Sequence, residues 1–247
     1  HMSAFFSWSG GKDSMLALHR ALAAGVHVEV LLAMFDEGGE RSRSHAIPPQ
    51  LMQAQADALG IELVIGRAGW ADYEAVFTQR LREFAARGIT HGLFGDIDLQ
   101  PHRDWEEKVC IAAGLRAELP LWQERRGALV DELLGLRYRA RVVCVDARFL
   151  DASFCGREFD ASFLADLPEG VDACGENGGT RGGGGARDPP ERPRARPPFR
   201  CGAALMRGKA PVWFFDLDNT LHDASHAAFG ATNRAMTEYI VDHLDMD

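Results

Sequence analysis

Apolar and polar positions alternate along the first 165 or so residues in two ways. Short, nearly continuous apolar runs are typical of strands buried on both faces of a sheet, whereas apolar residues at every third or fourth position are typical of helices. These patterns predict strands at Ala4–Trp8, Val28–Phe35, Ile61–Ile65, Gly92–Ile97, Leu119–Trp122 and Arg141–Val145. They predict helices at about Asp13–Gly25, Pro48–Leu59, Asp72–Gly88, Trp105–Ala113 and Leu129–Leu136, and part of another at Phe159–Leu164.

The alternation of strands and helices predicts an α/β fold, in which residues 3–165 form a mostly parallel sheet with helices on both faces. We expect Ala4–Trp8, Val28–Phe35 and Gly92–Ile97 to be neighbouring parallel strands. Ligands of such sheets bind beyond the carboxyl ends of the strands. The loop that follows Ala4–Trp8 is therefore the first candidate site.

This loop suits a phosphate or pyrophosphate group. Its two glycines allow close approach of the backbone, and a helix begins at once, so the first helical N–H groups have no partner within the helix. The helix dipole, a lysine and two serine hydroxyls add to these donors. An ordinary glycine turn with an N-capping serine is the simpler alternative. The loop consists of Ser9, Gly10, Gly11, Lys12, Asp13 and Ser14.

The glycine spacing of the loop differs from that of a Walker A motif. The string Ser-Gly-Gly-Lys-Asp-Ser instead resembles the PP-loop of the N-type ATP pyrophosphatases. That resemblance implies an adenine nucleotide alpha hydrolase-like fold and an enzyme that cleaves ATP between the α and β phosphates and transfers AMP to an acceptor. It also implies Mg²⁺, for which Asp13 is the candidate ligand.

A second group of polar residues lies at and after the end of the predicted strand Gly92–Ile97. Asp96 can hold Mg²⁺ or orient a nucleophile, and Arg103 can bind a phosphate or a carboxylate with two hydrogen bonds. The alternative is structural. Asp96 would then cap a turn or a helix, and Arg103 would pair with Glu107 one helical turn further on.

Several motifs together resemble the diphthine–ammonia ligase family of PP-loop proteins over about residues 3–178. The family implies ATP-dependent amidation, in which a carboxylate attacks the α-phosphate, pyrophosphate leaves and ammonia displaces AMP. The motifs are the loop, Gly95-Asp96-Ile97 followed by Arg103, Glu107 and Cys110, then Pro120-Leu121-Trp122 and Cys174-Gly175-Glu176-Asn177-Gly178, with Ser42, Arg43 and His45 matching a further family segment.

The resemblance also implies roles, with ATP, ammonia and an unidentified carboxylate as partners. Catalysis would be mostly positioning and charge stabilisation. The residues on the side of ATP and Mg²⁺ would be Ser9, Gly10, Gly11, Lys12, Asp13, Ser14 and His45. Those on the acyl-acceptor side would be Asp96, Arg103, Glu107, Glu176 and Asn177. Another PP-loop activity, such as RNA-base thiolation or modification, and a nucleotide-binding protein with impaired catalysis stay open as alternatives.

The family pattern stops at residue 178. Family members continue into a Glu-aromatic-His-Thr stretch, so we expect residues 166–180 to be a truncated substrate-region motif. Residues 181–209 contain six glycines, five prolines and eight basic residues among 29, which predicts a disordered linker.

Residues 210–247 resemble the start of a haloacid dehalogenase-like phosphatase, with Asp216 as its nucleophile and Asp218 as its acid/base. The rest of such an enzyme does not follow. Our hypothesis is a frame-shifted or fused reading frame. Within it we expect Val212–Phe215 to be a strand that docks on an exposed sheet edge, and Ala224–Leu244 to be helical.

Composition limits the cellular location and the kinds of binding site that we expect for this protein. No apolar segment approaches the ~20 residues of a membrane helix and no signal-peptide pattern is present, so we expect a cytoplasmic protein without a membrane partner. Five cysteines without a Cys-x-x-Cys pair argue against disulfides, a zinc site and thiolation chemistry. The net charge of −9 argues against a large nucleic-acid surface. The oligomeric state stays open, with a dimer as one option.

Overall fold

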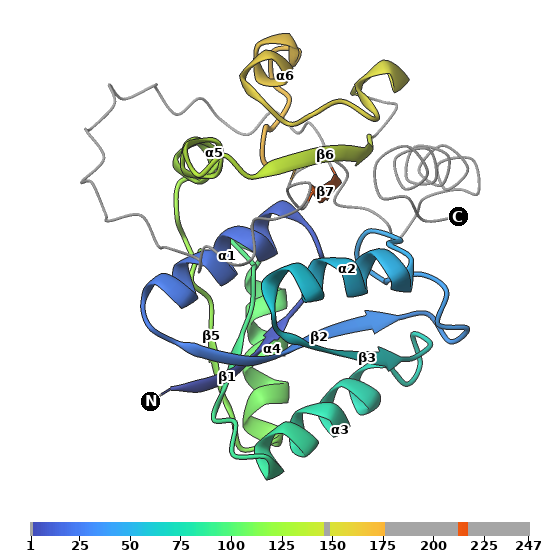
Figure 1. The fold of residues 1–247 in the computed structure, drawn as a ribbon, viewed down its shortest axis with the longest axis vertical. Helices are drawn as coiled ribbons and strands as arrows, with labels where there is room; N and C mark the ends of the chain where they lie inside the picture. Colours follow the sequence, from blue (N-terminus) through green and yellow to red (C-terminus); the bar gives the residue numbers. More distant parts are fainter. Residues whose placement is uncertain (1, 146–148, 176–211, 217–247) are drawn as a thin grey trace.

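A computed structural model describes residues 2–145 and 149–175, and the backbone of residues 212–216. At its centre lies a five-stranded parallel sheet in the order β3-β2-β1-β4-β5 (Figure 1). In register, Phe5 pairs with Val30 on one side and with Gly92 on the other. The three strands that we expected to be parallel neighbours are therefore confirmed. The strands are β1 Ser3–Ser7, β2 His27–Phe35, β3 Glu62–Arg67, β4 His91–Leu93 and β5 Arg116–Glu118.

Helices cover both faces of this sheet, as the α/β prediction requires. The central strand β1 sends alternate side chains to opposite faces. Phe6 belongs to the core that contains α1 and α2, and Phe5 belongs to the core that contains α3 and α4. The helices are α1 Lys12–Ala23, α2 Pro49–Leu59, α3 Tyr73–Ala86, α4 Gln100–Ala112, α5 Arg126–Gly135 and α6 Ala161–Asp166, with a 3-10 turn at Ala152–Phe154.

A second layer lies on the outer side of α1 (Figure 1). Leu129 and Leu133 of α5, Val142 of the next strand and Phe163 of α6 extend the core that α1 shares with the sheet. The strand of this layer, β6 at Arg139–Cys144, pairs in parallel with β7 at Val212–Asp216. The strand predicted at Val212–Phe215 is thus present, and the edge on which it docks is that of β6.

Differences from the predicted elements are concentrated around β4 and β5. β4 ends at Leu93, and α4 begins at Gln100 with a proline in its first turn, five residues earlier than predicted. The strand predicted at Leu119–Trp122 is wrong. β5 precedes it, and the Trp122 N–H donates to the Leu119 carbonyl in a turn (N···O 3.1 Å). The apolar run Leu119–Trp122 was mistaken for a strand because it is too short to show a period.

Several predictions lie outside the described residues. They concern Glu176 and Asn177, the linker 181–209, Asp218 and the helical segment Ala224–Leu244. The domain boundaries stay predictions as well. Across the part of the chain that the structure describes, no helix is both long and apolar enough to cross a membrane.

Candidate functional site

The loop between β1 and α1 takes a path that only its glycines allow. Gly10 has a φ of +80°, and a Cβ there would lie 2.7 Å from both Gln55 Oε1 and Ile47 Cδ1. Gly11 is the N-cap of α1, where a Cβ would lie 2.5 Å from His45 Nε2. Gly10 requires glycine because its φ is positive as well. At Gly11 a Cβ could be accommodated only if the His45 side chain moved. The close approach of the backbone that the two glycines predict is therefore present at both residues.

The polar side chains of the loop bind one another. The Ser9 and Ser14 hydroxyls are 2.6 Å apart, and the Gly11 N–H donates to Ser9 Oγ (3.2 Å). Lys12, whose side chain is only 2% exposed, forms an ion pair with Asp13 (Nζ···Oδ2 2.5 Å). Burial raises the pKa of Asp13, although the Lys12 charge opposes this shift. The loop thus holds a buried cation beside a carboxyl group at the start of a helix.

Gln55 of α2 braces the loop and was missed by the sequence argument. Its side-chain amide donates to the Gly10 carbonyl (3.2 Å), and its oxygen accepts from the Trp8 indole N–H (3.3 Å). Gln55 is only 2% exposed. A lone polar residue on the face of a helix that buries Met52 and Ala56 was the signal that could have found it.

The segment after β2 places a neutral histidine over the loop. The Ile47 N–H donates to Ser42 Oγ (3.0 Å), and Ala46 has a φ of +53°, so the chain turns back toward Gly11. Burial, with a further contribution from Lys12, lowers the pKa of His45 to about 4. His45 Nδ1 is buried and has no hydrogen-bond partner among the described residues.

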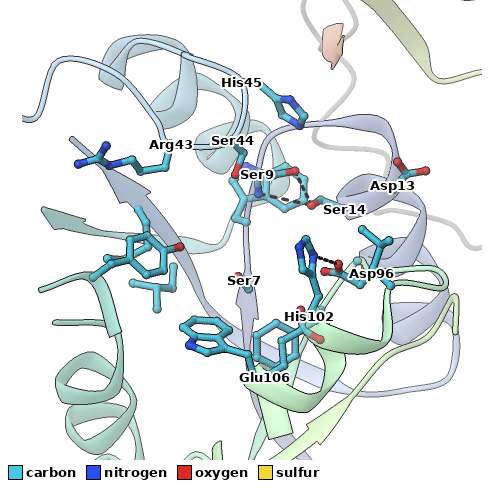
Figure 2. Close-up of a pocket in the computed structure, with 18 of the residues that line it drawn as sticks. Ser7, Ser9, Asp13, Ser14, Arg43, Ser44, His45, Asp96, His102 and Glu106 are labelled. Atoms are coloured by element: carbon cyan, nitrogen blue, oxygen red, sulfur yellow. Dashed lines mark hydrogen bonds and ion pairs between the residues drawn. The ribbon is translucent and has the colours of Figure 1, made fainter. Parts of the chain in front are cut away.

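These residues border a cavity of about 470 Å³ beyond the carboxyl ends of β1, β2 and β4. Figure 2 shows His45 and Arg43 along its upper rim, Ser9 and Ser14 at its centre, and Asp96 with His102 below them. We call the side formed by Ser9, Lys12, Asp13, Ser14 and His45 the loop wall. Gly10 and Gly11 lie behind it and do not line the cavity.

The opposite side, which we call the acidic wall, consists of Asp96, His102 and Glu106. His102 Nδ1 lies 2.7 Å from Asp96 Oδ1. Burial disfavours the charge of Asp96, but hydrogen bonds with His102 and Glu106 outweigh it and lower the pKa. Burial, together with the Asp96 charge, raises the pKa of Glu106 to about 11, so this carboxyl group keeps its proton at neutral pH.

Gly95 brings the two walls together. A Cβ at this position would lie 3.1 Å from the Ser14 backbone nitrogen and 3.2 Å from its Cα. A side chain there would therefore press on the first turn of α1. Because the residue is glycine, the chain leaving β4 packs directly on α1 and places Asp96 beside the loop.

Arg103 and Glu107 do not line the cavity. Arg103 Nε donates to Glu107 Oε1 (2.7 Å), and its guanidinium group lies over the Trp122 ring, 5.0 Å from the centroid. This is the structural alternative that the spacing of these two residues allowed. Glu106 faces the cavity instead, because neighbouring residues of a helix point about 100° apart.

Aromatic side chains form the outer part of the cavity. Trp70 stacks on Tyr73 with ring centroids 5.9 Å apart, and Tyr73 lies at the same distance from Trp105. The Arg43 guanidinium group lies 4.6 Å from the Trp70 centroid. Burial raises the pKa of Tyr73 to about 12, so its hydroxyl stays protonated. This surface can stack on a planar ring.

Arg126 ties the segment that precedes Glu176 to the cavity. Its guanidinium group contacts Asp98 (Nε···Oδ2 2.9 Å) and Asp172 (Nη1···Oδ2 2.6 Å). The Cys174 thiol donates to the Arg126 carbonyl (3.3 Å). Gly175, at the end of this segment, lines the cavity. The two catalytic candidates Glu176 and Asn177 themselves lie outside the described residues.

Nothing in the described ranges gathers three or more His, Cys, Asp or Glu side chains into an arrangement that could hold a metal ion. Mg²⁺ does not require such a cage, because it is commonly bound by one or two carboxylates together with substrate phosphates. Asp13, at the loop and beside Asp96, fits that mode. The cavity thus offers donors for an anion on one side and carboxyl groups on the other.

The amino-terminal part of the chain is similar to a known protein family. Residues 2–117 match the family model described as the diphthamide synthase N-terminal domain. The match confirms the expected family over these residues and ends before Cys174. A comparison with curated proteins gave no match.

One similar solved structure is described as a predicted subunit of a tRNA methyltransferase from Methanocaldococcus jannaschii. It is 19% identical, with a TM-score of 0.38, over 53% of this chain and 75% of that chain. At these values the likeness carries no argument about function. The family likeness extends over residues 2–117, which are similar to the diphthamide synthase N-terminal domain of the PP-loop superfamily.

Proposed function

We propose that the protein binds ATP and catalyses AMP-forming amide ligation, in which a carboxylate is adenylated and then receives ammonia. The observation that carries this proposal is the glycine loop of β1–α1, whose buried Lys12 opens on the cavity opposite a pair of carboxyl groups. The PP-loop family of residues 2–117 supports the nucleotide. ATP provides the phosphates that the loop wall suits.

The triphosphate would lie along the loop wall. N–H groups at the start of α1 and the Lys12 ammonium group supply charge-assisted hydrogen bonds to phosphate oxygens. Lys12 now pairs with Asp13, so a phosphate would take over part of this ion pair. His45, neutral at physiological pH, can donate one hydrogen bond without adding charge. The donors would stabilise the negative charge of the leaving pyrophosphate.

Mg²⁺ fits beside Asp13, where it would neutralise charge on the phosphates and make the α-phosphate more electrophilic. The chain itself would do the remaining work by positioning. Gln55 fixes the path of the loop, because its side-chain amide donates a hydrogen bond to the Gly10 carbonyl. The aromatic surface of Trp70 and Tyr73 offers a stacking partner for a planar ring. The acidic wall faces the reacting end of the nucleotide.

The proposal is tested by exchange of radiolabelled pyrophosphate into ATP. The purified protein is incubated with Mg²⁺, ATP and one candidate carboxylate at a time, and the nucleotide product is identified. We expect carboxylate-dependent exchange and AMP as the product. The Lys12→Ala variant should lose the exchange, and Lys108→Ala should keep it, since Lys108 is exposed and pairs with Glu74 away from the loop. Formation of ADP would exclude the adenylation mechanism.

A further inference from the structure

The acidic wall contains two carboxyl groups that have fewer hydrogen-bond donors around them than their oxygens can accept. The Asp96 and Glu106 carboxyl groups lie close enough that, after burial, the Asp96 charge is the next largest cause of the raised pKa of Glu106. His102 provides one donor, to Asp96 Oδ1. Glu106 is 4% exposed and its Oε2 has no donor among the described residues, although the residue lines the cavity.

This imbalance defines the chemistry of a ligand. Two carboxyl groups offer about eight lone pairs, and among the described residues His102 is the one recorded donor to them. A buried acceptor without a donor costs free energy, and a buried negative charge costs more. A ligand that carries N–H groups and a positive charge would remove both costs. A neutral ligand would remove only the first.

A divalent metal ion satisfies these conditions less well. Mg²⁺ dehydrates reluctantly and is commonly bound where substrate phosphates join one or two carboxylates, which is the arrangement proposed beside Asp13. Ammonium has no such requirement, because its four N–H groups can be shared between carboxyl oxygens and water. It is also small enough to lie between side chains of one cavity wall.

We propose that Asp96 and Glu106 form a subsite that binds ammonium beside the nucleotide. The inference rests on the proposed amide ligation, for which it names the place where the nitrogen enters. It also identifies Glu106, rather than Glu107, as the α4 carboxyl group that contacts a reactant. In either protonation state Glu106 keeps an oxygen that can accept an N–H hydrogen bond.

Binding can be tested without an acceptor and without turnover. Thallium(I) resembles ammonium in charge and size, and its position follows from anomalous scattering of soaked crystals. We expect a thallium peak at Asp96 and Glu106 that ammonium displaces. The Glu106→Leu variant should lose the peak. Asp104→Leu, which removes an exposed carboxylate from the same helix, should keep it. A missing peak in the wild type, one that survives in Glu106→Leu, or displacement by Mg²⁺ but not by ammonium would overturn the proposal.

Kinetics separate this proposal from the proposed function. Pyrophosphate exchange uses no ammonia, so in the wild type it reports on adenylation alone, and Asp104→Leu should leave it unchanged because Asp104 is exposed. Amide formation is then measured in Glu106→Leu. The KM for ammonium in amide formation should rise about tenfold, the loss expected for one hydrogen bond to a charged group. Glu106→Gln keeps a carbonyl oxygen and should restore most of the affinity. Loss of exchange in the wild type would reject amide ligation, whereas an unchanged KM would reject the ammonium subsite alone. A rise in KM with Glu107→Leu but not with Glu106→Leu would also reject it.

Discussion

The loop wall comes from one stretch of six residues with His45 above it, whereas the acidic wall combines the end of a strand with one face of a helix. The first presents a lysine and a neutral imidazole, and the second presents two carboxyl groups, of which Glu106 keeps its proton at neutral pH. The loop wall is therefore suited to anions and the acidic wall to cations. The comparison shows how one cavity can hold an anionic and a cationic reactant apart. The anion site is built from consecutive residues of one loop, and the cation site is built from two elements that meet only in the folded protein.

The largest effect should come from the loop wall. Lys12→Ala removes a buried cation, and we expect the Kd for ATP in calorimetric titration to rise about 100-fold. Asp13→Ala should weaken binding in the presence of Mg²⁺. Lys108→Ala provides the matched control, because its partner Glu74 lies on α3. Equal affinity for ATP in the wild type, Lys12→Ala and Asp13→Ala would remove nucleotide binding at the loop.

A second prediction tests the geometry of the loop wall. In Gly11→Ala the new Cβ would lie 2.5 Å from His45 Nε2, so one of the two must move. We expect the free energy of unfolding, measured in urea, to fall by about 2 kcal/mol. The double variant Gly11→Ala/His45→Ala should recover most of this loss. Gly127→Ala in α5 meets no atom within 4 Å and should be neutral or slightly stabilising. A Gly11→Ala protein of unchanged stability would contradict the contact.

The loop wall could be predicted from the sequence because its chemistry lies in consecutive residues. Ser9–Ser14, the strand before it and the helix after it follow each other without a break. Local patterning was also sufficient for the parallel sheet and for the helices on its faces.

Of the acidic wall, only Asp96 could be predicted in the same way, because it lies at the end of a predicted strand. The choice between Glu106 and Glu107 depends on the rotation of α4, and the predicted start of that helix was five residues late. Gln55 and His102 become visible only when α2 and α4 are packed against the loop and Asp96. Contacts between segments that are distant in the sequence depend on tertiary packing. The pattern of residues within one segment does not show them.

A third prediction concerns the pH dependence that the acidic wall imposes. The pKa of Glu106 is raised to about 11 in the folded protein, so between its usual value and this one only the folded state holds the proton. Stability therefore falls as pH rises through that window. Glu106→Gln removes this dependence. In urea unfolding we expect the stability of the variant relative to the wild type to rise between pH 5 and pH 8, by up to about 1.4 kcal/mol per pH unit.

Asp104→Asn is the control for the pH experiment, because this exposed carboxylate lies on the same helix. A difference between the wild type and Glu106→Gln that does not change with pH would show that Glu106 titrates normally.

The smallest effect should come from Arg126, which lies outside both walls and holds residues 172–175 against the cavity. Arg126→Ala leaves the Asp98 and Asp172 carboxylates without this guanidinium group. Because the pair is partly exposed, we expect a loss of only about 0.5–1 kcal/mol of unfolding free energy. Amide exchange at residues 172–175 should become faster. Arg80→Ala, which removes a pair on the exposed surface of α3, should change neither measurement appreciably.

Gly95 gives the cavity a mechanical property. The backbone that carries Asp96 rests directly on the first turn of α1, with no side chain between them to absorb a shift. Movement of that turn when phosphates arrive would be transmitted to the carboxylate across a single layer of backbone contact. Binding of phosphates at the loop wall would thereby shift Asp96 in the acidic wall through direct backbone contact.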